Sequence, residues 1–197
     1  MTVVFDFDRT LTERDTVFRF YKEFSKNIVK LTILTVSMIF SKIGILTNAT
    51  IKKIGVHFFL LGLPEKVVIE KGQKYFSKIR LREDIIARLE KHVANGDKVV
   101  VLSASYECYI SALRSRWNDV IVIGSKLAID KDGKVQGLSF NCYGENKLEA
   151  LQRSGIHSVD ILYTDGFADR AIMRISKKVI VVRKHGWHSI KLEARGL

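Results

Sequence analysis

The sequence predicts an α/β protein whose core is a parallel sheet covered by helices on both faces, with a helical segment inserted after the first strand. Two observations support this fold class. After residue 82, short buried runs typical of strands alternate with helical patterns, and this alternation favours a parallel sheet between two layers of helices. Between residues 15 and 78, apolar positions instead recur every three or four residues, which is typical of consecutive helices.

The individual elements follow from local patterns. The buried run Val3-Val4-Phe5 predicts the first strand, and Asn27, the Gly44–Asn48 region and Gly62-Leu63-Pro64 divide the inserted segment into several helices. Asp130-Lys131-Asp132-Gly133 predicts a hairpin turn. The other elements alternate along the chain, with helices over residues 83–93, 106–117, 147–153 and 170–175, and strands over residues 98–102, 120–123, 160–163 and 179–182.

We divide the chain into a core, residues 1–13 and 81–197, and an inserted helical unit, residues 14–80. The charge distribution agrees with this division. The net charge of +12 is concentrated in two segments, because residues 14–80 carry +9 and residues 174–197 carry +6, whereas residues 81–173 carry −1. A basic surface favours a polyanionic partner, which could be nucleic acid, an anionic membrane or a phosphorylated substrate.

Cysteine use and hydropathy indicate the compartment. Cys108 and Cys142 are too few for a disulfide framework or a zinc finger, so we expect free thiols in a reducing cytoplasm. No signal-peptide pattern is visible, because the strand-like start runs straight into acidic residues. Lys30 and Lys42 interrupt the apolar stretch over residues 28–46, which therefore predicts a buried or interfacial helix. We expect a cytoplasmic protein, with peripheral contact at the inner face of the membrane as an alternative.

Polar residues follow the predicted strands at the end where parallel sheets bind ligands. Asp6 and Asp8 follow the first strand, Ser103 and Asp165 follow two later strands, and Lys147 opens a helix. Asp6 and Asp165 would make an oxygen site suited to Mg²⁺. Beside such an ion one carboxylate can attack a phosphoryl group while a second serves as general acid and base. Ser103 and Lys147 would supply a donor and a positive charge to the phosphoryl oxygens.

Each of these residues, taken alone, also fits a turn or a helix cap. In this combination and order, however, they resemble the four motifs of the haloacid dehalogenase superfamily, in its phosphoserine-phosphatase-like branch. The stretch Asp6-Phe7-Asp8-Arg9-Thr10 is similar to the first motif of that family. The resemblance covers the whole chain and implies a Rossmann-like core with an inserted α-helical cap at residues 14–80.

The resemblance also implies the chemistry. It implies a Mg²⁺-dependent phosphatase in which Asp6 is the nucleophile, forming an aspartyl-phosphate, and Asp8 is the general acid and base. A haloalkanoic-acid dehalogenase is less favoured, because those enzymes use no Mg²⁺ and lack a counterpart of Asp8. The implied supporting residues are the phosphate-binding group Thr10, Ser103, Ala104 and Lys147, the metal ligands Asp6, Asp8 and Asp165, and Asp169 as a support for the metal or for Lys147.

Three positions depart from the family pattern and bear on specificity. Arg9 replaces a small residue, so its guanidinium is expected to line the entrance or to pair with a neighbour. Ala168 stands where phosphoserine phosphatases usually have Asn. Asp15 stands where they have a Glu that reads the amino-acid end of the substrate, and it is either a shorter version of that residue or a cap of the first inserted helix. Phosphoserine specificity is therefore not implied.

The inserted segment bears on the substrate. Two apolar runs, residues 31–40 and 56–61, either pack together as a helical bundle or form a lid that touches lipid. The lysines among them would then face anionic headgroups. These lysines are Lys26, Lys30, Lys42, Lys52 and Lys53. The segment resembles that of bacterial phosphatidylglycerophosphatases. We expect a small phosphorylated substrate that is lipid-linked or otherwise amphiphilic, with a phosphoserine-like metabolite as the alternative.

A different class of function is a basic module that binds nucleic acid or an anionic surface. The sequence contains no zinc finger, RNA-recognition signature or glycine-rich KH loop. Its aromatic residues lie in apolar runs and are not interleaved with Lys and Arg, unlike a base-stacking platform. We therefore expect no nucleic-acid partner.

Overall fold

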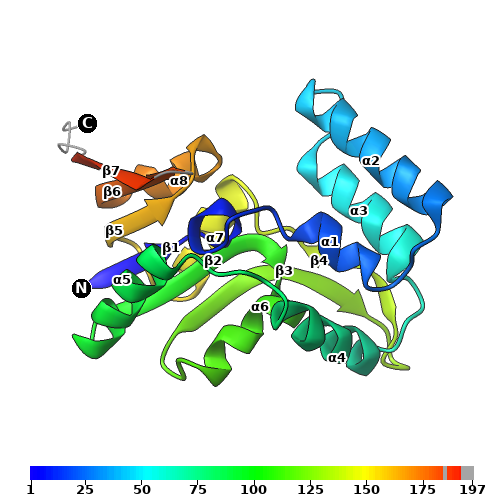
Figure 1. Ribbon diagram of the computed structural model, residues 1–197, viewed down its shortest axis with the longest axis horizontal. Helices are drawn as coiled ribbons and strands as arrows, with labels where there is room; N and C mark the ends of the chain where they lie inside the picture. The colour runs from blue at the N-terminus through cyan, green and yellow to red at the C-terminus, as the bar shows by residue number, and fades with distance from the viewer. Residues whose placement is uncertain (184–185, 192–197) are drawn as a thin grey trace.

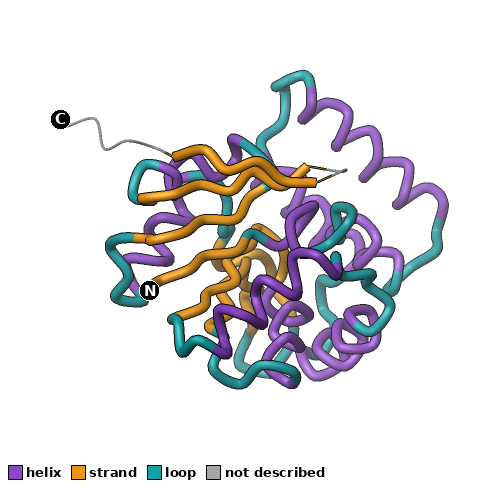
Figure 2. The backbone as a smooth tube through the Cα atoms, turned by 60° about the vertical axis from the view of Figure 1, so that its left-hand side comes forward, coloured by secondary structure: helices purple, strands orange, loops and turns teal. Residues whose placement is uncertain are grey.

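The computed structural model describes residues 1–183 and 186–191, with side chains up to residue 183. This part of the chain forms one sheet of seven strands in the order β4-β3-β2-β1-β5-β6-β7. The strands are β1 (Thr2–Phe5), β2 (Lys98–Tyr106), β3 (Ile121–Ile129), β4 (Val135–Phe140), β5 (Val159–Thr164), β6 (Ser176–Arg183) and β7 (Gly186–Lys191). The five inner strands are parallel, and the edge strands β4 and β7 pair antiparallel to their neighbours. Figure 2 shows the strands side by side.

Helices cover both faces of the sheet, which confirms the predicted fold class. The short strand β1 lies at its centre, and its side chains alternate between the two faces. Val3 and Phe5 pack in the same apolar cluster as the helix α5 (Glu83–Ala94). Val4 packs on the opposite side with α7 (Glu145–Arg153) and α8 (Arg170–Met173). A strand that is buried on both faces needs a continuous apolar run, and the first residues of the chain supply it.

Four helices lie between β1 and α5: α1 (Val17–Lys22), α2 (Ile28–Lys42), α3 (Asn48–Phe59) and α4 (Glu65–Phe76). In Figure 1, α2 and α3 stand together at one end of the molecule, whereas α4 lies against α6 (Glu107–Ile110). The contact of α4 is close, since a Cβ added at Gly72 would lie 2.9 Å from the carbonyl oxygen of Cys108. The division at residues 14 and 80 stays a prediction.

The helix expected over residues 106–117 is shorter in the structure and consists of two parts. The strand β2 continues to Tyr106, which pairs with Ser125 of β3, and α6 then runs only to Ile110 before a tighter turn, η2 (Ser111–Ser115). The predicted hairpin is confirmed, and pairing with β4 extends β3 to Ile129. The side chains of the basic tail beyond residue 183 lie outside the described residues.

The two apolar runs of the inserted segment differ in burial. In the second run, Val56, Phe59 and Leu60 are buried, as expected of helices that pack together. In the first, which α2 contains, only Leu34 and Ser37 are buried. Its outer face stays exposed because α2 contacts α3 along one side. Within the described ranges, no helix is both long enough and apolar enough to cross a membrane.

Candidate active site

A cavity of about 260 Å³ lies at the carboxyl ends of β1, β2 and β5, beneath α2 and α3. It brings together residues from distant parts of the sequence. Among the residues that line it are nine that the sequence analysis singled out as candidates: Asp6, Asp8, Arg9, Asp15, Ala104, Lys147, Asp165, Ala168 and Asp169. Thr10 and Ser103 lie directly behind this wall and are completely buried. The predicted positions therefore converge on one place in the fold.

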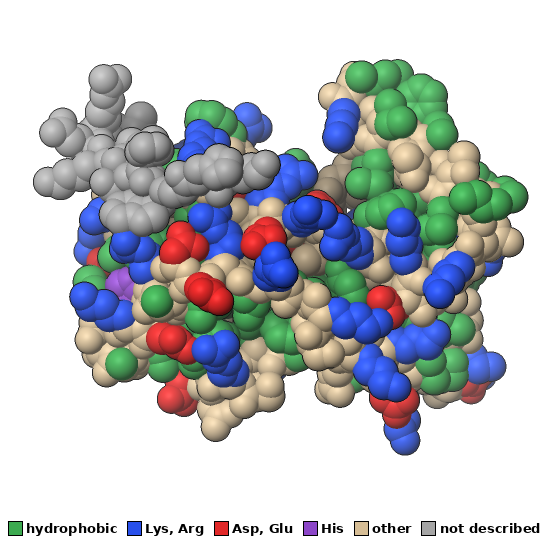
Figure 3. Space-filling view, viewed as in Figure 1, with side chains coloured by type: hydrophobic (Ala, Val, Ile, Leu, Met, Phe, Trp, Pro, Cys, Tyr) green, Lys and Arg blue, Asp and Glu red, His purple; other side chains and the backbone are tan. Residues whose placement is uncertain are grey.

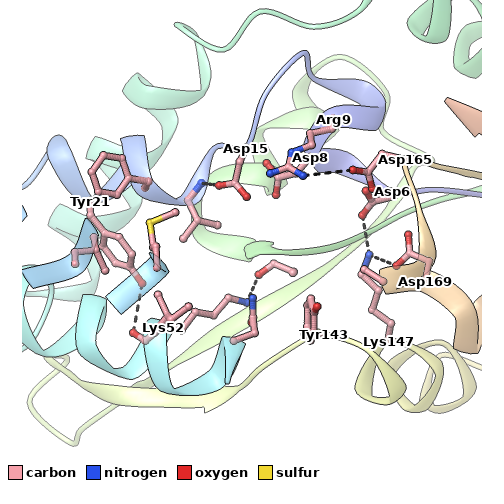
Figure 4. A pocket seen from close by; sticks show the side chains of 18 residues that line it. Asp6, Asp8, Arg9, Asp15, Tyr21, Lys52, Tyr143, Lys147, Asp165 and Asp169 are labelled. Carbon is pink, nitrogen blue, oxygen red and sulfur yellow. Dashed lines mark hydrogen bonds and ion pairs between the residues drawn. The ribbon is translucent and has the colours of Figure 1, made fainter. Parts of the chain in front are cut away.

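Asp6 and Lys147 form the buried centre of the site. The Lys147 ammonium lies 2.7 Å from Asp6 Oδ1 and 2.6 Å from Asp169 Oδ1, as Figure 4 shows. Burial opposes the charged ammonium, but the two carboxylates raise the pKa of Lys147 above its ordinary value. Burial also raises the pKa of Asp6, against the influence of Lys147. The single ammonium of Lys147 thus pairs with the buried carboxylates of both Asp6 and Asp169.

The supporting residues fix this centre from behind. Thr10 Oγ1 donates a hydrogen bond to Asp6 Oδ2 at 3.3 Å. Thr164 Oγ1 donates to Asp169 Oδ2 at 2.7 Å, which leaves the other oxygen of Asp169 for Lys147. The expectation that Asp169 supports Lys147 agrees with this geometry. Ser103 Oγ accepts the main-chain N–H of Ser105 at 2.9 Å, so its own hydroxyl proton is not needed for that bond.

Asp8 is held by a second set of hydrogen bonds. Its Oδ1 accepts from the main-chain N–H and the hydroxyl of Thr16, at 2.8 and 2.7 Å, and its Oδ2 accepts from Ser105 Oγ at 2.5 Å. The hydroxyl of Tyr109 lies 2.7 Å from Thr16 Oγ1 and must donate to it, because Thr16 has given its single proton to Asp8. Burial and then the nearby Asp15 raise the pKa of Asp8 to about 6, although these hydrogen bonds oppose the rise.

Sequence reasoning missed Thr16, Ser105 and Tyr109. No spacing in the sequence marks them, since Ser105 lies 97 residues from Asp8. Thr16 reaches Asp8 because the chain turns sharply after β1, where Arg9 adopts a left-handed conformation with φ of 60°. Such a conformation is uncommon outside glycine, and it lies directly after the two aspartates that line the cavity.

We expect Thr16→Val to lower kcat for a small aryl phosphate about tenfold while KM changes little, because Asp8 loses the hydroxyl that orients it. Steady-state kinetics at saturating Mg²⁺ would measure this. Valine keeps the shape of threonine, and the exposed Thr32→Val is the matched control. An unchanged kcat in Thr16→Val would contradict an orienting role.

The three departures from the family pattern lie around the mouth of the cavity. The exposed Arg9 guanidinium lies 3.9 Å from Asp165 Oδ2. Of the two expectations for Arg9, the structure therefore shows the ion pair with a neighbour. Asp15 Oδ1 accepts the main-chain N–H of Val17 at 3.1 Å, in the first turn of α1, and also lines the cavity. The N-cap of α1 is Thr16, so Asp15 bonds to the start of this helix from one residue earlier, and its contact with a substrate stays a prediction. Ala168 leaves the mouth without an amide at that position.

The wall opposite the carboxylates is largely apolar. It is formed by side chains of α1, α2 and α3, namely Val17, Phe18, Tyr21, Leu34, Met38 and Ile51. Two polar residues of α3, Asn48 and Lys52, interrupt it. Asn48 Oδ1 is buried and has no hydrogen-bond partner within the described part of the chain. Sequence reasoning counted Lys52 among the surface lysines; this was wrong, because only 3% of its surface is exposed.

A family model described as haloacid dehalogenase-like hydrolase matches residues 3–174. The chain belongs to the haloacid dehalogenase-like hydrolase family. This match confirms the family resemblance that we inferred from the Asp6–Thr10 motif. It also confirms the expectation that the protein is an enzyme. Membership agrees with the placement of the motif residues around one cavity.

Similar proteins include a curated relative and solved structures. Protein CicA of Caulobacter vibrioides is 25% identical over 179 residues, which cover 86% of this chain and 78% of CicA. A haloacid dehalogenase family hydrolase, t0658 from Salmonella enterica serovar Typhi, superimposes on 89% of the chain with a TM-score of 0.67 and 17% identity, and the match spans 60% of its length. A phosphoserine phosphatase, solved as an analogue of its phospho-aspartyl intermediate, gives a TM-score of 0.63 with 21% identity, over 91% of this chain and 85% of its own. These structural likenesses show a shared fold.

The family implies Mg²⁺, and the donors in this haloacid dehalogenase-like hydrolase fit that ion. Asp6 and Asp165 present carboxylate oxygens to the same cavity, and burial raises the pKa of both, so a cation there would offset unfavourable negative charge. The carboxylate of Asp8 is engaged by Thr16 and Ser105, which leaves its main-chain carbonyl as the predicted ligand. Among the described residues, no three acidic, His or Cys side chains gather as a metal cluster.

Proposed function

We propose that the protein is a Mg²⁺-dependent phosphomonoester hydrolase that works through an aspartyl-phosphate on Asp6. The observation that carries the proposal is the buried Asp6–Lys147–Asp169 centre beside Asp8 in one cavity. Family membership supports hydrolysis, and the solved phosphoserine phosphatase that shares the fold forms an intermediate of the same type. The cytoplasmic location expected from the two cysteines stays a prediction.

The reaction has two steps. In the first, an Asp6 oxygen attacks phosphorus, the bond to the leaving alcohol oxygen breaks, and Asp8 gives that oxygen a proton. In the second, the ionised Asp8 takes a proton from water, whose oxygen attacks the phosphorus and releases Asp6 and phosphate. With a pKa raised to about 6, Asp8 is protonated more readily near neutral pH than an ordinary carboxyl.

The phosphoryl group needs positive charge and donors around it. Lys147 supplies the charge, and Ser103 with the main chain at Ala104 supplies the predicted hydrogen-bond donors. Bound Mg²⁺ would neutralise charge on the phosphoryl oxygens and between the carboxylates. Lys147 also favours the ionised form of Asp6 that attack requires, because its ammonium lies against the nucleophile, whereas burial opposes that form.

The leaving group that best fits the cavity is amphiphilic. Phe18, Leu34 and Met38 offer apolar surface to it, and the unpartnered oxygen of Asn48 offers one acceptor for a hydroxyl or amine. This wall supports a lipid-linked or similar phosphate. A phosphoserine-like metabolite is the second candidate, favoured by Asp15 at the mouth and disfavoured by Ala168.

We also propose that α2 meets an anionic membrane surface. Its outer face exposes Ile28 and Ile39, with Ile39 56% exposed, and Ile43 is exposed directly after its last residue. Figure 3 shows apolar side chains gathered over this helix. Lys26 and Lys42 are exposed at its two ends, where they could approach anionic headgroups. Because the inner face of α2 lines the cavity through Leu34 and Met38, one helix would join the membrane to the active site.

Two neighbouring substitutions separate these proposals. We expect Met38→Glu to lower kcat/KM for a long-chain alkyl phosphate about tenfold, both in dispersed form and in anionic vesicles, because it places a charge in the apolar wall. Ile39→Glu, on the outer face, is expected to weaken vesicle binding and hydrolysis in vesicles only. Phosphate release and vesicle sedimentation measure the two effects.

Each outcome assigns the substrate class. If the wild-type protein hydrolyses small phosphates well but does not hydrolyse the lipid phosphate, the proposal of an amphiphilic leaving group is rejected. Equal vesicle binding by Ile39→Glu and wild type would reject the membrane contact. Salt-sensitive binding of DNA or RNA without any Mg²⁺-dependent hydrolysis would instead favour the binding module.

A further inference from the structure

Lys52 is a buried cation that the proposed reaction does not use. It lies on α3, one helical turn after Asn48, and its side chain runs into the cavity opposite the carboxylates, as Figure 4 shows. Among the ion pairs of the described chain, none involves Lys52. A buried charge without a counter-charge is costly, and it therefore calls for a physical explanation.

The ammonium of Lys52 joins three separate segments of the core. It donates to the carbonyl oxygen of Ala104, to Ser125 Oγ at 2.7 Å and to Asn141 Oδ1 at 2.7 Å. Ala104 lies near the end of β2, where the register with β3 shifts, Ser125 lies in β3, and Asn141 lies in the loop that leads to α7. All three donor protons of the ammonium are thereby used.

These contacts bear directly on the general acid. The carbonyl of the peptide between Ala104 and Ser105 accepts from Lys52 and from Ser125 Oγ, and its N–H donates to Ser103 Oγ. That peptide carries Ser105, whose hydroxyl holds Asp8. On the other side, Asn141 accepts a side-chain hydrogen bond from Asn146, the neighbour of Lys147 in α7. Lys52 thus contacts both the end of β2, which carries Ser105, and the loop that leads to Lys147.

Stability does not account for this charge. Burial lowers the pKa of Lys52 to about 8, despite the opposing influence of Cys142, Asp8 and Asp15, while Lys147 adds to the lowering. A lysine whose pKa falls on folding destabilises the folded state at pH values below that pKa, where the ammonium is buried charged. The pKa of Cys142 is raised to about 12, away from this range.

We propose that Lys52 is a positioning residue that must be charged for catalysis, because its ammonium locks the Ala104–Ser105 peptide and the Asn141 loop in the arrangement that aims Asp8 at the leaving oxygen. The inference rests on the proposed phosphatase function. It assigns the inserted helix α3 a part in the chemistry as well as in substrate contact.

The test compares wild type, Lys52→Met, Asn141→Ala and the matched control Lys53→Met, whose side chain is the exposed neighbour on α3. Phosphate release from p-nitrophenyl phosphate is followed from pH 6 to 9 at saturating Mg²⁺. This substrate has no charged group besides the phosphoryl group, so a direct contact of Lys52 with a second anionic group cannot cause the effect. Thermal unfolding of each variant is recorded alongside.

We expect the wild-type kcat to fall as pH rises through about 8, since the neutral amine offers one proton fewer. Lys52→Met should lower kcat at pH 7 by about ten- to a hundredfold, lose this alkaline decline and keep its unfolding temperature. Asn141→Ala removes one hydrogen-bond acceptor of the Lys52 ammonium, which makes the charged form less stable. The fall of kcat should therefore begin at a lower pH in this variant. Lys53→Met should match wild type.

An unchanged kcat and pH profile in Lys52→Met would overturn the proposal. So would a defect confined to the KM of substrates with a second anionic group, because Lys52 would then read the leaving group directly. If Lys52→Met fails to fold, an unshifted decline in Asn141→Ala overturns it and a shifted one supports it. Absence of Mg²⁺-dependent hydrolysis in wild type would instead reject the proposed function.

Discussion

Asp6→Asn is expected to lower kcat for Mg²⁺-dependent hydrolysis of an aryl phosphate by at least about 10⁴-fold. An amide oxygen carries no full negative charge, so it is a poor nucleophile and cannot form the acyl phosphate. The same change removes one predicted ligand of the ion and leaves Lys147 with Asp169 as its remaining carboxylate partner. Single-turnover phosphate release at saturating substrate measures the loss.

The control for this variant is Asp132→Asn, an exposed aspartate in the β3–β4 turn, which should keep full activity. Circular dichroism on both proteins would show that the fold persists. The aspartyl-phosphate mechanism would be wrong if Asp6→Asn hydrolysed the substrate at the wild-type rate. Acid-stable phosphate on another residue would point to a different nucleophile.

Lys147→Met is expected to affect both stability and activity. Removing its ammonium leaves the buried carboxylates of Asp6 and Asp169 without the cation between them, and breaking a buried ion pair in this way costs about 3–5 kcal/mol of unfolding free energy. Loss of the charge that faces the phosphoryl group should lower kcat by about 10²- to 10³-fold. Urea unfolding and steady-state kinetics measure the two effects.

A double variant separates these effects. Lys147→Met with Asp169→Asn removes one of the two stranded charges, so it should recover part of the stability and none of the activity. Lys177→Met is the matched control, because its ammonium pairs with Asp160 at the surface and contributes little to stability. If Lys147→Met unfolds with the same free energy as wild type, the buried carboxylates of Asp6 and Asp169 do not need Lys147 for stability.

The central residues of the site could be predicted from the sequence for a physical reason. In a parallel sheet the carboxyl ends of the strands meet at one edge, so residues that follow strands converge wherever the helices lie. Asp6, Asp8 and Asp165 follow strands and Lys147 opens a helix at the same edge; all four line the cavity. The apolar run Val3-Val4-Phe5 predicted a buried strand before the first motif, and the strand order places that strand at the centre of the sheet.

What surrounds those residues could not be predicted in the same way. Thr16, Ser105 and Tyr109 hold Asp8 through contacts that depend on how α1, α6 and the end of β2 pack together. A hydroxyl is a short-range donor, and a displacement of about 1 Å would break such a bond. Nothing in a local pattern reports distances between segments to that accuracy.

The sequence by itself determined the fold class, the family motif and the aspartates and lysine at the strand ends, because apolar periodicity and strand order fix which edge of the sheet gathers them. Only the tertiary structure decided which of the adjacent residues Lys52 and Lys53 is buried, although both have the same side chain. The rotation of α3 against the sheet buries the first beside Ala104 and leaves the second in solvent. Packing sets that rotation, and a helical pattern alone does not.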